Sequence, residues 1–111
     1  MRTKYNSKAV TLDGERFDST GESRRWRELK LLERARKIRN LERQVAYELQ
    51  PKYKAESGKT IRAIKYVADF RYEEDGVLVV EDFKGMQTDV FKLKAKMFGY
   101  VYPDIELRIT K

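Results

Sequence analysis

The chain has 111 residues, which is enough for one domain with a single hydrophobic core and too few for two. It contains no cysteine and no histidine, and this excludes a disulfide scaffold, a thiolate zinc site and catalysis by an imidazole or a thiol. The net charge is +7, and residues 1–40 carry most of the excess, with 12 Lys/Arg against 6 acids, which favours a polyanion as partner over a merely charge-rich surface.

Residues 1–17 are basic and show no sustained apolar periodicity, so the pattern predicts an N-terminal arm, with a hairpin signal at Asp13-Gly14. The segment 18–38 predicts an amphipathic helix of about 18 residues, because strong helix formers surround apolar side chains at helical spacing. The N-cap of this helix is expected among Asp18, Ser19 and Thr20.

Three strand patterns follow this helix. Residues 41–50 alternate apolar and polar side chains and end before Pro51, and residues 61–74 give a second strand after a polar connection. Asp75-Gly76 is a two-residue hairpin signal that joins the second strand to a third, at 77–83. The three strands are therefore expected to form an antiparallel meander.

A second helix is predicted at 89–102, capped by Thr88 or Asp89, and residues 104–110 alternate as a last short strand. The helical crossover before this strand favours parallel pairing with a neighbour in the sheet. The order of helix, three strands, helix and strand predicts an α/β fold of the α+β type, with a mixed sheet flanked by helices. Residues 18–111 are expected to make up this single domain.

Acidic side chains gather at the end of the third predicted strand. Asp82 and Lys84 lie on one face of it and Glu81 lies on the other, because side chains alternate along a strand. Counting outward from the turn at Asp75-Gly76 places Asp69 beside Asp82. Two adjacent carboxylates repel each other unless a cation neutralises them, so the pair predicts a Mg²⁺ or Mn²⁺ site. The alternative is a plain cross-strand ion pair between Asp69 and Lys84.

Glu22 is the third candidate acid. It stands at the edge of the apolar side of the first helix, near the end that would lean over the strands. A glutamate in the first helical turn also complements the helix dipole, which leaves a purely structural role open.

Four blocks of the sequence, in order, resemble the PD-(D/E)XK nuclease superfamily. They are FDSTGESRRWRELKLLERARKIRNLERQ, YVADFRY, VVEDFKG and TDVFKLKAKMF, and the resemblance covers residues 16–109. The blocks are similar to a family of small phage-encoded proteins with the plan of archaeal-type Holliday junction resolvases, which implies a restriction-endonuclease-like core. Ala68 stands where the superfamily has a proline. The choice of Asp82 over Glu81 follows from its parity with Lys84, and a bulge at the end of the strand would reverse it.

The resemblance implies a metal-dependent endonuclease that cuts branched DNA as a phage Holliday junction resolvase. Its catalytic residues would be Glu22, Asp69, Asp82 and Lys84, with the three acids holding Mg²⁺ or Mn²⁺ and Lys84 positioning the attacking water. Paired symmetric cuts in a four-way junction imply a homodimer. The alternatives are a non-catalytic nucleic-acid-binding module and a nuclease for flaps, ends or single strands.

Basic residues of the arm and of both helices are candidate contacts to backbone phosphates of DNA, which fix register without reading sequence. A solvated helix face is the alternative for the three lysines of the second helix, of which Lys94 is expected nearest the cleft. The candidates are Arg2, Lys4, Lys8, Arg24, Arg25, Arg27, Lys92, Lys94 and Lys96.

No apolar run approaches the roughly 20 residues of a membrane span, and the N-terminus lacks the apolar core of a signal peptide. We therefore expect a cytoplasmic protein, located in the host cell cytoplasm if it is phage-encoded.

Overall fold

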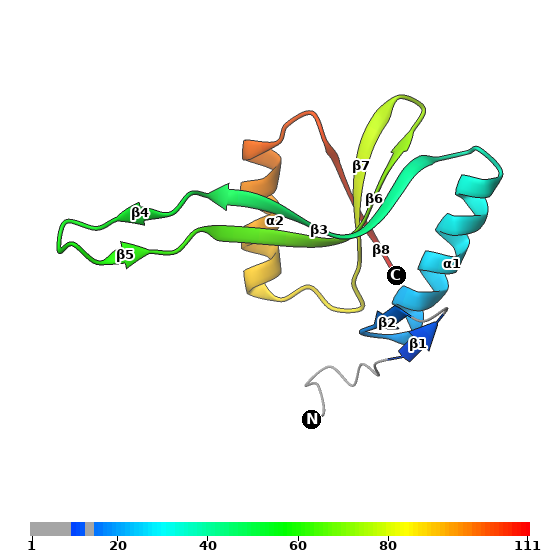
Figure 1. Ribbon diagram of the computed structural model, residues 1–111, viewed down its shortest axis with the longest axis horizontal. Helices are drawn as coiled ribbons and strands as arrows, with labels where there is room; N and C mark the ends of the chain where they lie inside the picture. Colours follow the sequence, from blue (N-terminus) through cyan, green and yellow to red (C-terminus); the bar gives the residue numbers. More distant parts are fainter. Residues whose placement is uncertain (1–9, 13–14) are drawn as a thin grey trace.

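A computed structural model describes residues 10–12 and 15–111, with two helices beside a mixed four-stranded sheet in the order β3-β6-β7-β8 (Figure 1). The sheet strands are β3 (Arg39–Gln50), β6 (Ile64–Glu74), β7 (Val77–Phe83) and β8 (Glu106–Thr110). The helices are α1 (Thr20–Arg34) and α2 (Asp89–Val101). Two small hairpins pair β1 (Val10–Leu12) with β2 (Glu15–Phe17) and β4 (Tyr53–Lys54) with β5 (Thr60–Ile61). The predicted α+β fold, with a mixed sheet flanked by helices, is confirmed.

The pairing of the sheet strands follows the predicted topology. Strands β3, β6 and β7 form the antiparallel meander, and β8 returns through α2 to pair in parallel with β7. The turn between β6 and β7 is tight, because Asp75 and Gly76 take φ angles of 52° and 78°, the left-handed conformation that a two-residue hairpin of this kind requires. From this turn the register runs outward to the pair Phe70 and Glu81.

Both helices begin at the predicted caps. The Ser19 hydroxyl accepts a hydrogen bond from the Glu22 N–H at 3.1 Å, and the Thr88 hydroxyl accepts one from the Phe91 N–H at 3.1 Å. Helix α1 ends at Arg34, before the predicted end at residue 38, since Arg36 takes a φ of 62° that a helix cannot continue.

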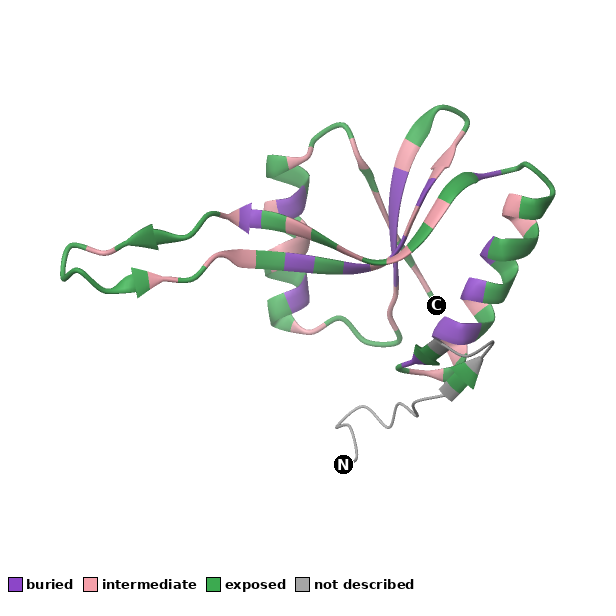
Figure 2. Cartoon of the chain, in the orientation of Figure 1, coloured by how far each residue is buried: buried purple, intermediate pink, exposed green. Residues whose placement is uncertain are grey.

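Buried side chains form two clusters, one against each helix. Figure 2 shows that buried residues occur on both helices and on strands of the sheet. Val79 belongs to the α1 cluster and Val80 to the α2 cluster, because successive side chains point to opposite faces of β7. The two helices therefore lie on opposite faces of this strand. The α1 cluster contains Phe17, Trp26, Leu29, Ile38, Phe70, Tyr72 and Val79, and the α2 cluster contains Leu49, Tyr66, Ala68, Val80, Phe91 and Phe98.

The long β3–β6 pair curves between the two helices (Figure 1). Ala68 of β6 packs in the α2 cluster and Phe70, two residues later, packs in the α1 cluster. Alternation alone would keep both on one side of a flat sheet, so the change marks a bend at Asp69. On the neighbouring strand, Gln44 has a φ of 51°. The bend places Asp69 between the two helices, where the candidate site lies.

Two features differ from the sequence prediction. Phe17, assigned to the arm, is fully buried against Trp26, with ring centroids 6.4 Å apart, so it belongs to the core of the domain. The polar connection after Pro51 contains the β4–β5 hairpin, which projects beyond the sheet (Figure 1). Asp13-Gly14, the predicted turn, lies outside the described residues. Within the described part of the chain, neither helix is long and apolar enough to cross a membrane.

Candidate active site

Asp82, near the end of β7, has a buried carboxylate on the α2 side of the sheet, with 1% of the residue exposed. The Tyr66 hydroxyl donates a hydrogen bond to its Oδ2. Its Oδ1 is buried and has no hydrogen-bond partner among the described residues, and Lys84 Nζ lies 3.7 Å away from it. Buried carboxylate oxygens normally have donors, so this atom is available to a cation.

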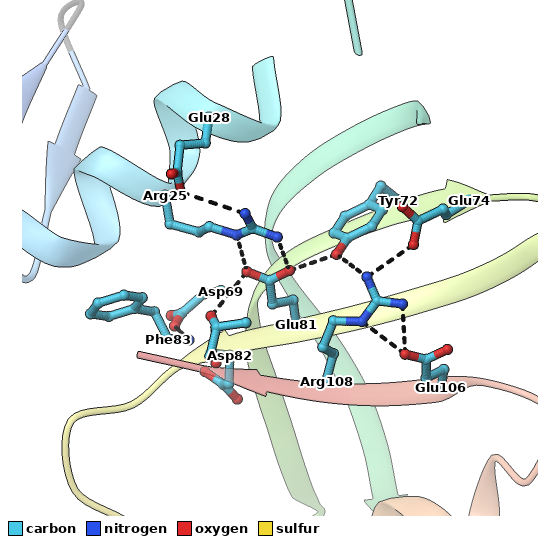
Figure 3. Close-up of polar contacts among 11 residues, drawn as sticks. Arg25, Glu28, Asp69, Tyr72, Glu74, Glu81, Asp82, Phe83, Glu106 and Arg108 are labelled. Carbon is cyan, nitrogen blue, oxygen red and sulfur yellow. Dashed lines mark hydrogen bonds and ion pairs between the residues drawn. The ribbon is translucent and has the colours of Figure 1, made fainter. Parts of the chain in front are cut away.

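Asp69 lies beside Asp82 on the neighbouring strand, as the count from the turn predicted (Figure 3). Its Oδ2 accepts a hydrogen bond from the backbone N–H of Phe83 at 2.8 Å, which fixes the carboxylate against the end of β7. Burial raises the pKa of Asp69, and the Phe83 N–H and the nearby Lys84 charge act in the opposite direction. Burial likewise raises the pKa of Asp82 to about 6, offset in part by Lys84 and by the backbone of Asp69.

Glu22, in the first turn of α1, is also buried, with 4% exposed. Burial is the main cause that raises its pKa to about 7, and the negative charge of Asp69 is the next. Glu22 Oε2 lies 3.5 Å from Arg43 Nη2 and accepts a hydrogen bond from Gln44 Nε2 at 3.5 Å. The glutamate is therefore within electrostatic reach of Asp69 and is held by two side chains of β3.

The chemistry of these acids fits a hard divalent cation, because Glu22 and Asp82 are buried and Asp69 is half-buried, each has a raised pKa, and Asp82 offers an oxygen without a hydrogen-bond partner among the described residues. However, the described residues contain no group of three acidic side chains close enough to hold one metal ion together. The predicted set of three ligands is thus only partly assembled. Asp69 and Asp82 lie on adjacent strands, whereas Glu22 contacts Arg43 and feels the charge of Asp69.

Lys84 lies on the same side of the sheet as Asp82, as predicted from parity. Its Nζ is 4.9 Å from the centroid of the Phe91 ring of α2, and its backbone N–H donates to Thr110 O at 2.8 Å. The side chain is 32% exposed, so the ammonium group can reach both Asp82 and solvent. The alternative ion pair between Asp69 and Lys84 is not among the contacts of the described residues, in which the lysine pairs with Asp82.

Glu81 points to the opposite face of β7, toward α1, and is fully buried (Figure 3). Arg25 donates to both of its oxygens, at 2.6 Å from Nε and 3.0 Å from Nη2, and the Tyr72 hydroxyl donates at 2.6 Å. Thr110 Oγ1 donates at 3.1 Å. The alternation in sequence predicted the face of Glu81, but it gave no sign of this network, because the partners come from α1, β6 and β8.

The network changes the assignment of one predicted DNA contact. The side chain of Arg25 is 22% exposed and its guanidinium is bound to Glu81, so it connects α1 to the sheet rather than presenting its charge to DNA. On the far side of Tyr72, Arg108 donates to the Tyr72 hydroxyl at 3.2 Å and to Glu74 at 2.9 Å.

The other predicted DNA contacts remain predictions. Arg24 and Arg27 are exposed on α1, Lys92 and Lys96 are exposed on α2, and Lys94 is half-buried. Arg2, Lys4 and Lys8 lie outside the described residues.

Comparison with known proteins places the chain in a family without assigning its activity. A family model described as "Protein of unknown function (DUF1064)" matches residues 2–111. Searches of the curated proteins and of the solved structures gave no match. Because the match covers nearly the whole chain, the protein belongs to the DUF1064 family.

Proposed function

We propose that the protein is a metal-dependent DNA endonuclease of the PD-(D/E)XK type, which cuts branched DNA as a homodimeric phage Holliday junction resolvase. The observation that carries the proposal is the buried Asp82 Oδ1, which lacks a hydrogen-bond partner among the described residues and lies 3.7 Å from Lys84 Nζ. Asp69 is on the neighbouring strand, and its carboxylate is held by the Phe83 N–H. The parallel return of β8 through α2 onto β7 accords with a restriction-endonuclease-like core.

A purely structural role accounts poorly for this arrangement. An ion pair stabilises a fold when its buried atoms are also hydrogen-bonded, and a buried charge that lacks such bonds is costly. Asp82 has one such bond, from Tyr66, and its other oxygen is 3.7 Å from the lysine. On the opposite face of the same strand, Glu81 has donors on both oxygens. The contrast supports a functional role for Asp82 and a structural role for Glu81.

In the proposed mechanism, each of these residues has a separate role in phosphodiester hydrolysis. Tyr66 and the Phe83 N–H orient the carboxylates of Asp82 and Asp69, which would hold Mg²⁺ or Mn²⁺, and Glu22 adds negative charge beside them. A bound ion of this kind supplies Lewis acidity and lowers the pKa of a water molecule. Lys84 directs its ammonium group to the same side, where it can orient the attacking water and offset charge that develops on the phosphate.

The direct test is cleavage of a four-way junction with each strand labelled in turn, in Mg²⁺ or Mn²⁺. Wild-type protein should make paired symmetric nicks, whereas Asp82→Asn and Lys84→Ala should each lose about 100-fold or more in rate. Asp104→Asn, which changes an exposed acid, is the matched control and should cleave normally. Flap, blunt-end and single-stranded substrates, tested in parallel, measure the preference for junctions.

The possible failures have separate meanings. If wild-type protein cleaves no DNA in either metal, the nuclease proposal is wrong. If it cleaves and both site variants cleave equally well, the nuclease proposal stands and the assignment of Asp82 and Lys84 is wrong. If it cleaves flaps or ends in preference to junctions, the proposed substrate class is wrong.

A further inference from the structure

Residues 51–63, which we call the β-arm, form a two-stranded projection at the end of the sheet opposite α1 (Figure 1). Its tip is an ordered turn, in which the Ala55 N–H donates to Lys59 O at 2.8 Å and the Gly58 N–H donates to Ala55 O at 2.9 Å. Gly58 takes a φ of 89°, a conformation that glycine adopts without strain. The β-arm is thus a regular, hydrogen-bonded hairpin rather than an irregular connection.

The β-arm contributes nothing to the hydrophobic core. None of its residues is buried, and Figure 2 shows the hairpin in the colours of exposed and half-buried residues only. Tyr53, its one aromatic residue, is 50% exposed. An isolated two-stranded hairpin is only marginally stable in water, and this one buries no residue. A contribution to the stability of the fold therefore does not explain the presence of the β-arm.

The β-arm carries mostly positive charge. Its four basic side chains are all exposed and have no ion-pair partner among the described residues, and Glu56 is its one acid. Such a surface is complementary to a polyanion, because basic side chains that bind phosphates release condensed counterions. The four residues are Lys52, Lys54, Lys59 and Arg62.

The shape of the β-arm fits duplex DNA. A two-stranded β-ribbon is narrow enough to enter the major groove of B-DNA, which is about 12 Å wide. Lys59 is ten residues before Asp69 along the same side of the hairpin, so at about 3.3 Å per residue the two lie up to about 33 Å apart. This upper limit is close to one helical turn of B-DNA, about 34 Å.

We propose that the β-arm binds the phosphate backbone along the major groove of duplex DNA, within about one helical turn of the phosphate that would be cleaved at Asp69 and Asp82. The choice of DNA rests on the proposed function. The exposed charge and the ribbon shape are independent of it.

The test compares two triple variants in binding to a labelled DNA duplex, in EDTA so that no cleavage occurs. The arm variant is Lys54→Gln/Lys59→Gln/Arg62→Gln. The control variant is Arg34→Gln/Lys37→Gln/Arg39→Gln, which removes the same charge from exposed residues at the end of α1 and the start of β3. Affinity is measured over a range of salt concentrations, and thermal melting verifies that both variants are folded.

The arm variant should bind duplex DNA about tenfold or more weakly at 0.1 M salt. The slope of log affinity against log salt should fall by about 2.7, which corresponds to three lost phosphate contacts, while the control keeps a slope close to that of wild type. An unchanged slope in the arm variant, or an equal loss in both variants, would overturn the proposal. A loss confined to single-stranded DNA or to RNA would also overturn it.

Because binding is measured without metal, this result does not depend on catalysis. Absence of cleavage by the wild-type protein would refute the proposed nuclease and leave the assignment of the β-arm intact. Absence of duplex binding by the wild-type protein would refute the β-arm proposal.

Discussion

Glu81 and Asp82 are neighbours in the chain, and their carboxylates lie on opposite faces of β7. Glu81 accepts hydrogen bonds from Arg25, Tyr72 and Thr110, whereas Asp82 keeps one oxygen without a hydrogen-bond partner among the described residues. Two acids of similar burial therefore have different local chemistry. The Glu81 carboxylate, which has hydrogen bonds on both oxygens, joins α1 to the sheet. The Asp82 carboxylate faces Lys84 on the side of the proposed cleavage site.

The link between Arg25 and Glu81 can be tested by its effect on stability. Arg25→Ala removes the partner of a fully buried carboxylate and should lower the free energy of unfolding by about 3 kcal/mol, measured by urea denaturation. Arg24→Ala, which changes the exposed neighbour, should alter it by less than about 0.5 kcal/mol. The double variant Arg25→Ala/Glu81→Gln should recover part of the loss, because the uncompensated charge is gone. Equal stabilities of Arg25→Ala and Arg24→Ala would show that the network does not stabilise the fold.

Metal binding should depend on Asp82. Mn²⁺ at millimolar concentration should raise the melting temperature of the wild-type protein by about 2–5 °C, because the ion binds the folded state alone. Asp82→Asn should abolish this rise. Without metal the variant should be at least as stable as wild type near pH 8, since it removes a buried carboxylate whose pKa is raised to about 6. The control Asp104→Asn should keep the full response to Mn²⁺, and a full response in Asp82→Asn would exclude the aspartate as a ligand.

Stability without divalent metal should decrease as the pH rises. The pKa of Glu22 is raised from 4.5 to about 7 and that of Asp82 from 3.8 to about 6, so the folded chain binds more protons than the unfolded chain between these values. The free energy of unfolding should therefore fall between about pH 4 and pH 7, by an amount on the order of 1–3 kcal/mol. Urea denaturation in EDTA at several pH values measures this slope.

Glu22→Gln should flatten that pH dependence, because it removes the group with the higher of the two pKa values. Glu28→Gln, an exposed glutamate of the same helix, should leave the slope as in wild type. A slope that is unchanged in Glu22→Gln would show that Glu22 does not titrate in this range.

The close approach of α1 to the end of β7 depends on Gly21. A Cβ atom at this position would overlap the ring of Phe83, the residue whose N–H holds Asp69. Gly21→Ala should therefore lower the free energy of unfolding by about 1–3 kcal/mol through overpacking. Gly99→Ala, in α2, meets no atom within 4 Å and should raise it by up to about 1 kcal/mol through helix propensity. Urea denaturation of the two variants should thus give changes of opposite sign, and a neutral Gly21→Ala would contradict the tight packing.

Much of the fold could be predicted because its signals are local. The cap at Ser19 and the turn at Asp75-Gly76 depend on side chains and backbone angles within a few residues, and the register that brings Asp69 beside Asp82 follows by counting from that turn. The β4–β5 hairpin was missed, since its short strands lack the apolar alternation that identifies strands packed on a core.

The sequence by itself determined the order of the two helices and the four main sheet strands, the face of each residue on β7 and the register that leads from the turn to Asp69 and Asp82, because alternation and turn geometry act over short distances. Tertiary structure decided the contacts between elements. It bound Arg25 to Glu81, placed Glu22 against Arg43 and left one oxygen of Asp82 without a hydrogen bond among the described residues. These contacts join residues up to 56 positions apart, and they depend on how the bend at Asp69 orients the helices against the sheet, which no local pattern specifies.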